Sequence, residues 1–133
     1  MADELRVAIA SDTDIVVARQ QGRALAARLA FSPSDLTVIA AAISEIARNI
    51  VEYASRGEII LTLAEKGDRQ GICVVAKDEG PGIPDIPLAL EDGYSTSGSL
   101  GLGLPGARRL MDEFEIQSAN GQGTTVTMRK WTR

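Results

Sequence analysis

Histidine does not occur in this chain of 133 residues. Its absence excludes a histidine general base, a histidine metal ligand and a phosphohistidine formed on this chain. Cysteine occurs once, as Cys73 within the apolar run Ile72–Val75. One cysteine cannot form an internal disulfide, and its apolar neighbours indicate a buried strand thiol rather than a reactive one.

Basic residues are fewer than acidic ones, and long apolar runs are missing. The 14 Lys and Arg against 18 Asp and Glu leave a net charge of −4. That charge argues against general nucleic-acid binding, which requires clustered cations to neutralise phosphates. The pairs Arg108-Arg109 and Arg129-Lys130 are expected to be solvated surface. No run is long enough to span a membrane, and Met1–Glu4 lacks the features of a signal peptide. We therefore expect a cytoplasmic protein that binds neither membrane nor nucleic acid.

The remaining composition is that of a globular protein. Apolar residues make up 44% and charged residues 24% of the chain, so wholesale disorder is not expected. A chain of this length can bury one hydrophobic core without disulfides or structural metals. With no internal repeat and no linker, residues 1–133 are expected to form a single domain.

The order of predicted elements indicates the fold class. The order is strand, two helices, two strands, a long loop, one helix and two strands, which predicts an α/β two-layer sandwich. Its helices should lie on one face of a mixed, mainly antiparallel sheet. Regular βαβ alternation is missing, which argues against a Rossmann domain. The predicted strands are residues 5–10, 58–65, 72–77, 114–118 and 124–128. The first predicted helix begins after Ser11, the second spans about 35–53, and the third runs from Gly101 to about Met111. The predicted loop is 81–99.

Glu45 and Asn49 are the first candidate functional pair. Apolar residues at three- and four-residue steps form the core stripe of the second helix, and this pair falls on the far side, one turn apart. A solvated face is the simpler interpretation. The small apolar residues Val38 and Ala42 on that face argue against it. An amide oxygen can ligate Mg²⁺, and a carboxylate can accept the proton of an attacking hydroxyl.

Two glycine-rich segments follow. Asp78 leads into Gly80 and Gly82, where it either begins a turn or accepts a hydrogen bond from an exocyclic amino group of a base. In Gly98–Leu104 the glycines are either flexible turn residues or lead into a helix whose first N–H groups cradle phosphates. No Gly-Lys-Ser/Thr follows, so this is not a Walker A loop.

In this order the three motifs resemble the N box and the two glycine boxes of the Bergerat-fold (GHKL) ATPases, which include gyrase, histidine kinases and anti-sigma serine kinases. Within this group the chain is similar to the stressosome switch serine/threonine kinases. Four segments carry that closer resemblance: Ser44–Val51, Asp92–Thr96, Gly101–Gly106 and Leu110–Phe114.

The resemblance implies roles for individual residues. Glu45 would be the general base, Asn49 the ligand of Mg²⁺ and Asp78 the residue that binds adenine. Residues from about Asp85 to Ser99 would form an ATP lid. The residues implied to bind ATP are Asn49, Asp78, Gly80, Gly82, Ser97, Gly98, Leu100, Gly101, Leu102, Gly103 and Leu104.

The resemblance also implies a function. The expected activity is Mg-ATP-dependent phosphorylation of a serine or threonine on STAS-domain stressosome proteins. After release, the kinase would switch partner to the regulatory domain of a serine phosphatase in a general stress response. A homodimer is compatible with the resemblance. The alternative is an ATP-dependent anti-sigma factor that sequesters a sigma factor, although Arg48 and Tyr53 replace what many anti-sigma relatives carry there.

Overall fold

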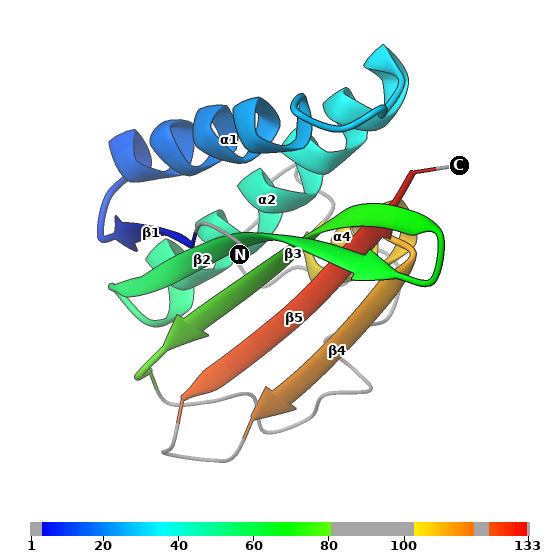
Figure 1. Ribbon diagram of the computed structural model, residues 1–133. Helices are drawn as coiled ribbons and strands as arrows, with labels where there is room; N and C mark the ends of the chain where they lie inside the picture. The colour runs from blue at the N-terminus through cyan, green and yellow to red at the C-terminus, as the bar shows by residue number, and fades with distance from the viewer. Residues whose placement is uncertain (1–3, 81–102, 119–122, 133) are drawn as a thin grey trace.

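Five strands and three helices make up the part of the chain that a computed structural model describes, residues 4–80, 103–118 and 123–132 (Figure 1). The elements follow the predicted order, with a long interval between β3 and α4. Their bounds are β1 Leu5–Ile9, α1 Asp12–Ala26, α2 Pro33–Tyr53, β2 Gly57–Lys66, β3 Arg69–Asp78, α4 Gly103–Leu110, β4 Glu113–Ser118 and β5 Thr124–Trp131.

The strands form one sheet in the order β1-β2-β3-β5-β4, and all four pairings are antiparallel. β3 is central and pairs over its full length with β2, from Arg69 opposite Lys66 to Asp78 opposite Gly57. The helices lie on one face of this sheet (Figure 1). The predicted two-layer α/β sandwich with a mainly antiparallel sheet is confirmed.

The core lies between the sheet and α2. The isoleucines of α2 are fully buried against inward-facing residues of β2, β3 and β5. α1 approaches α2 closely at Gly22, where a Cβ would collide with the side chain of Ile43. The buried stripe of α2 is wider than the sequence indicated, because it also includes Ala42 and Ile46.

The start of α2 at Pro33 follows from its N-cap residue, Ser32. Ser32 has extended backbone, and its hydroxyl accepts the N–H of Asp35 at 3.1 Å, while Pro33 occupies the first turn. The helix ends at Tyr53, and Ser55 follows in a left-handed conformation with φ of 70°. None of the helices in the described ranges is long and apolar enough to cross a membrane.

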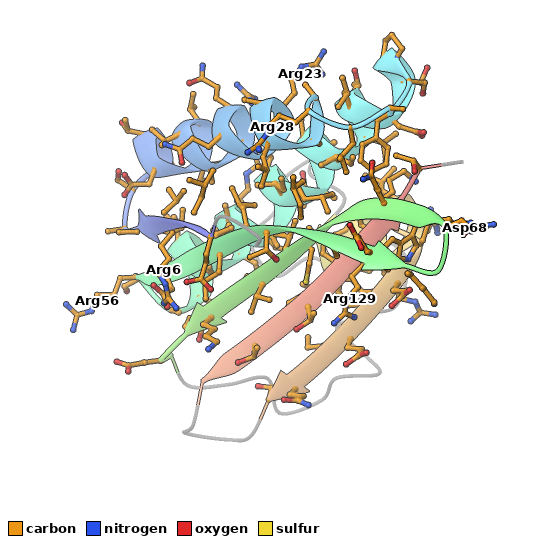
Figure 2. The ribbon with its side chains drawn as sticks, in the orientation of Figure 1. Arg6, Arg23, Arg28, Arg56, Asp68 and Arg129 are labelled. Carbon is orange, nitrogen blue, oxygen red and sulfur yellow. The ribbon has the colours of Figure 1, made fainter. Side chains whose placement is uncertain are left out.

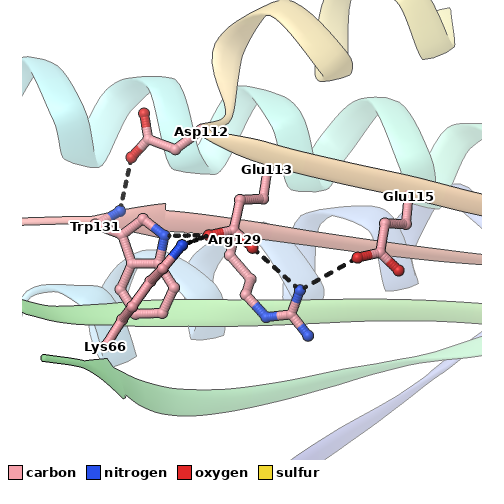
Figure 3. Close-up of polar contacts among 6 residues, drawn as sticks. All are labelled: Lys66, Asp112, Glu113, Glu115, Arg129 and Trp131. Carbon is pink, nitrogen blue, oxygen red and sulfur yellow. Dashed lines mark hydrogen bonds and ion pairs between the residues drawn. The ribbon is translucent and has the colours of Figure 1, made fainter.

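β5 corrects one expectation from the sequence. The strand runs to Trp131, three residues past its predicted end, because its last two residues continue the pairing with β3, Lys130 opposite Ile72 and Trp131 opposite Gly71. Lys130 is therefore buried and donates from Nζ to the carbonyl of Leu110 at 3.1 Å. Arg129 forms an ion pair with Glu113 (Figure 3). These cations are structural rather than solvated.

The free thiol of Cys73 also differs from expectation. It lies on β3, but the residue is only partly buried rather than buried. Alternate residues of β3 point to opposite faces of the sheet. Ile72 and Val74 are buried in the core, so Cys73 points to the face that α1, α2 and α4 leave uncovered.

Candidate nucleotide and catalytic site

Glu45 is held on α2 at the margin of the core. Its side chain is only 13% exposed, although the helical pattern placed it opposite the core stripe. Its Oε1 accepts a hydrogen bond from Nη1 of Arg48 at 2.9 Å, an i, i+3 ion pair on the same helix. A largely buried carboxylate with a charged partner is positioned more firmly than one on a solvated face. The structure thus gives Glu45 a partly buried carboxylate that is held by Arg48.

Asn49 lies one turn after Glu45 and is partly buried. The described residues contain no group of three or more His, Cys, Asp or Glu side chains that could hold a metal ion. A single amide oxygen suits Mg²⁺, which is commonly bound through one or two protein oxygens together with waters and substrate phosphates. The donor chemistry of Asn49 thus fits a metal that arrives with a nucleotide.

Asp78 ends β3, and two backbone N–H groups hold its carboxylate. Its Oδ1 accepts from Gly80 at 3.0 Å and from Thr124 at 3.2 Å. The first bond is the turn interaction considered from the sequence, and the second ties the residue to β5. Both bonds use Oδ1, which leaves Oδ2 outside them. The turn role and a base-binding role are therefore compatible, because they use different oxygens.

Gly80 brings the Asp78 turn against the end of α2. A Cβ on Gly80 would lie 2.7 Å from the Cβ and 2.9 Å from the Cα of Ala54, closer than real side chains pack. Ala54 follows Asn49 by five positions, or about 7.5 Å along the helix axis. The fold thus joins the helix of Glu45 and Asn49 to the turn of Asp78 and Gly80.

The second glycine segment is described only at its end. α4 begins at Gly103, close to the predicted start, and Leu104 and Ala107 are buried against the core. α4 packs against α2, the helix of Glu45 and Asn49. The predicted lid and the predicted ligands Gly82, Ser97, Gly98, Leu100, Gly101 and Leu102 lie outside the described residues.

Sequence reasoning did not single out Gly123 and Thr124. Gly123 has φ of 80°, and a Cβ there would collide with the carbonyl of Asp78. Thr124 is buried, and its hydroxyl lies 2.9 Å from that of Ser118. A glycine directly before a Thr-Thr strand start was the available signal. The Arg48 partner of Glu45 was also missed, although its i, i+3 spacing indicated it.

Comparison with known proteins gives the family. The model of the histidine kinase-like ATPase domain matches residues 9–130 of the chain. The chain belongs to this family. ATP binding and the fold follow from membership, and the matched range includes α2, the Asp78 turn, α4 and β5.

Two curated relatives refine the position within the family. The chain is 51% identical to the serine/threonine-protein kinase RsbT of Bacillus subtilis strain 168 over 100% of both chains. It is 31% identical to the anti-sigma F factor of Thermoanaerobacter sp. strain X514, over 86% of this chain and 82% of that one. The predicted enzyme class, a protein serine/threonine kinase, is confirmed by the full-length similarity. The anti-sigma alternative rests on more distant relatives and is not better supported.

Solved structures agree with this placement. The crystal structure of the RsbU and RsbW domains of a Mycobacterium tuberculosis protein superposes with a TM-score of 0.64 at 26% identity, covering 98% of this chain and 33% of that one. A mycobacterial sensor histidine kinase, MprB, superposes with a TM-score of 0.56 at 17% identity, covering 100% and 99%. The second likeness concerns the fold alone.

Proposed function

We propose that this family member is a cytoplasmic kinase that transfers the γ-phosphoryl group of Mg-ATP to a serine or threonine of a STAS-domain stressosome protein. One observation carries the proposal. A mostly buried carboxylate, Glu45, shares a helix with the amide of Asn49, and that helix ends against the turn of Asp78 and Gly80. A protein that only binds ATP does not need such a carboxylate beside the residues that bind the nucleotide.

Each residue has one task in this proposal. Asp78 accepts a hydrogen bond from the adenine amino group through Oδ2, while Oδ1 stays bound to the backbone. Glu45 takes the proton of the acceptor hydroxyl as its oxygen bonds to the γ-phosphorus. The bond from that phosphorus to the β-phosphate oxygen then breaks, and ADP leaves. Arg48 keeps the Glu45 carboxylate in place. Mg²⁺, when bound by Asn49, supplies charge neutralisation at the phosphates.

The remaining sequence-based expectations belong to the same proposal. Residues 1–133 act as one ATP-binding domain, and the lid at about 85–99 covers the nucleotide. Gly82, Ser97, Gly98 and Leu100–Leu104 contact ATP, and Gly103 supplies the start of α4 for the phosphates.

The proposal includes a switch of partner. Once its STAS substrate is phosphorylated, the kinase leaves it and binds the regulatory domain of a serine phosphatase. Likeness to a protein of known structure that contains both an RsbU and an RsbW domain supports a partner-switching system. A homodimer of the kinase is compatible with this scheme.

Intact-mass measurement tests the proposal. The chain is incubated with Mg-ATP and the STAS-domain protein of its own organism, with the Glu45→Gln variant as control. We expect the STAS protein to gain the mass of one phosphoryl group with the parent only. ATP binding without any mass gain would instead indicate an ATP-dependent binding protein, as in the anti-sigma alternative.

A further inference from the structure

Lys130 is a buried cation on the core face of β5. Its side chain is only 8% exposed, and it shares that face with Val126 and Met128, which belong to the hydrophobic core. The preceding residue, Arg129, points to the opposite face of the sheet, which the helices leave uncovered (Figure 2). Burying an ammonium group costs free energy, and an apolar residue of similar size would avoid that cost. Core packing therefore does not explain a lysine at this position.

The partners of Lys130 lie at the end of α4. Its Nζ donates to the carbonyl of Leu110, the last residue of that helix, at 3.1 Å. The last carbonyls of a helix have no partner within the helix, so this bond satisfies one of them from outside. Oδ1 of Asp112 lies 3.8 Å from the same nitrogen. Lys130 thus joins the end of β5 to the C-terminal end of α4, which lies behind β5 in Figure 1.

α4 is so short that its two ends move together. Its eight residues make a helix of about 12 Å. A helix of this length is not stable by itself in water, so its position depends on the contacts that hold it. Leu104 and Ala107 pack one side of α4 into the core, and the bond from Lys130 holds its last turn. A shift of the last turn would therefore also shift the start of the helix at Gly103.

The charge of Lys130 acts in the same direction. The helix dipole puts partial negative charge at the C-terminal end of α4 and partial positive charge at its N-terminal end. The ammonium group of Lys130 offsets the negative end. Arg108 and Arg109 lie in the same last turn but are exposed, so water and salt screen their charges more than that of a buried cation. The buried charge therefore favours an anion at the other end of the helix.

We propose that Lys130 is a positioning residue for the phosphate groups of the nucleotide. It acts through α4: the bond to Leu110 sets where the helix lies, and the buried charge favours anions at Gly103. The inference rests on the role of α4 in the proposed function and assigns part of the phosphate affinity to the opposite end of that helix. β5 then supports the nucleotide at both ends, because its first residue, Thr124, holds Asp78 at the adenine end.

Binding of adenosine, AMP and ADP separates this role from a merely structural one. Calorimetric titrations in Mg²⁺ compare the parent with Lys130→Met, which fills a similar space without the charge and the N–H donors. We expect Kd for ADP to rise about threefold to tenfold and Kd for AMP to rise less, whereas Kd for adenosine stays within about twofold. A residue that only stabilised the fold would change all three Kd values together or change none of them.

Three further variants sharpen the test. Lys130→Arg keeps a charged donor and should return Kd for ADP to within about twofold of the parent's. Lys66→Met is the matched control, because it removes the same charge from an exposed side chain at the same end of the sheet and breaks a bond to Glu113 there. Its three Kd values should match the parent's. If Lys130→Met is unfolded at the assay temperature, Lys130→Gln replaces it, because glutamine keeps an N–H donor without the charge.

The outcomes separate this inference from the proposed function. If the loss of Lys130 changes the three Kd values equally, or changes none, Lys130 has no role toward the phosphates and the kinase proposal stands. If the parent binds ADP no more tightly than adenosine, α4 does not hold phosphates, and this inference is wrong together with that part of the proposed function. If the Kd values follow the expected order but the STAS protein gains no phosphoryl group, the inference stands and the kinase proposal is wrong.

Discussion

Asp78 and Thr124 are joined by a hydrogen bond of 3.2 Å from the Thr124 N–H to the Asp78 carboxylate, across 46 positions of sequence. The two residues are register partners at the end of the β3–β5 pairing. Together with the Gly80 N–H, this bond fixes the carboxylate by one oxygen. The orientation of the proposed adenine-binding group is therefore set by the sheet and not by the turn alone.

Asp78→Asn should weaken ATP binding without unfolding the protein. The amide oxygen can still accept from Gly80 and Thr124, whereas the charged acceptor for the adenine amino group is lost. We expect a loss of about 1.5–3 kcal/mol in ATP affinity, the range for hydrogen bonds to charged groups. Calorimetric titration measures it, and thermal melting checks the fold. Unchanged affinity would leave Asp78 as a turn residue only.

Asn49→Ala should abolish the Mg²⁺ dependence of nucleotide affinity. The substitution removes the only metal ligand that we assign to the protein, and phosphoryl transfer depends on metal positioning and charge neutralisation. ATP titrations with Mg²⁺ and with EDTA measure the difference. Glu52→Ala, an exposed site on the same helix, is the control and should behave as the parent. Metal-dependent turnover that survives in Asn49→Ala would refute the assignment.

Glu45→Gln should separate binding from chemistry. Glutamine can still accept the hydrogen bond from Arg48, so the helix and the ATP affinity should change little. Loss of the general base should slow phosphoryl transfer by about 10²–10⁴-fold. Single-turnover assays measure the rate, and a pull-down should show that the variant still binds the phosphatase regulatory domain. Full activity in this variant would show that a residue other than Glu45 is the general base.

Gly80→Ala should push the Asp78 turn away from α2. The added Cβ would lie 2.7 Å from the Cβ of Ala54, so one of the two segments must move. We expect at least tenfold weaker ATP binding. Ala54→Gly removes the opposing Cβ, and the double variant should regain part of the affinity. A double variant no better than Gly80→Ala would show that the clash with the Ala54 Cβ is not what weakens ATP binding.

Glu113, at the end of the sheet away from Asp78, should make the free energy of unfolding depend on pH. Its carboxylate accepts from the indole N–H of Trp131 at 2.7 Å and from Lys66 at 3.1 Å (Figure 3). These hydrogen bonds, the Trp131 one first, and the nearby charges of Lys66 and Arg129 lower the pKa of Glu113 below its usual 4.5. Because the pKa of Glu113 is lower in the folded protein, its ionised carboxylate stabilises the fold above pH 4.5. This stabilisation is lost as the pH falls through the pKa that Glu113 has in the folded protein.

Glu113→Gln checks this directly. Urea unfolding at a series of pH values should show the parent more stable than the variant at neutral pH, with the difference shrinking below about pH 4.5. Glu65→Gln, on an exposed residue of β2, is the control and should track the parent. A stability difference that is constant with pH would point to packing around Trp131 instead of charge.

The sequence alone determined the element order, the fold class and the nucleotide motifs. These features are local: the Ser32 cap sets the start of α2, and the spacing of apolar residues sets its buried face. Glu45, Asn49 and Asp78 could be selected because their residue types suit metal and proton chemistry at helical and turn spacings. Their individual roles remain predictions.

Only the tertiary structure decided what surrounds them. Burial of Glu45 to 13% exposure depends on neighbouring elements, and the Thr124 bond to Asp78 exists because β5 pairs with β3. The burial of Lys130 and its hydrogen bond to the carbonyl of Leu110 likewise arise between elements distant in sequence. The periodicity of apolar residues within one segment shows which face of that segment is apolar. Contacts between segments depend on how the segments pack, and this packing cannot be predicted from the local pattern of either one.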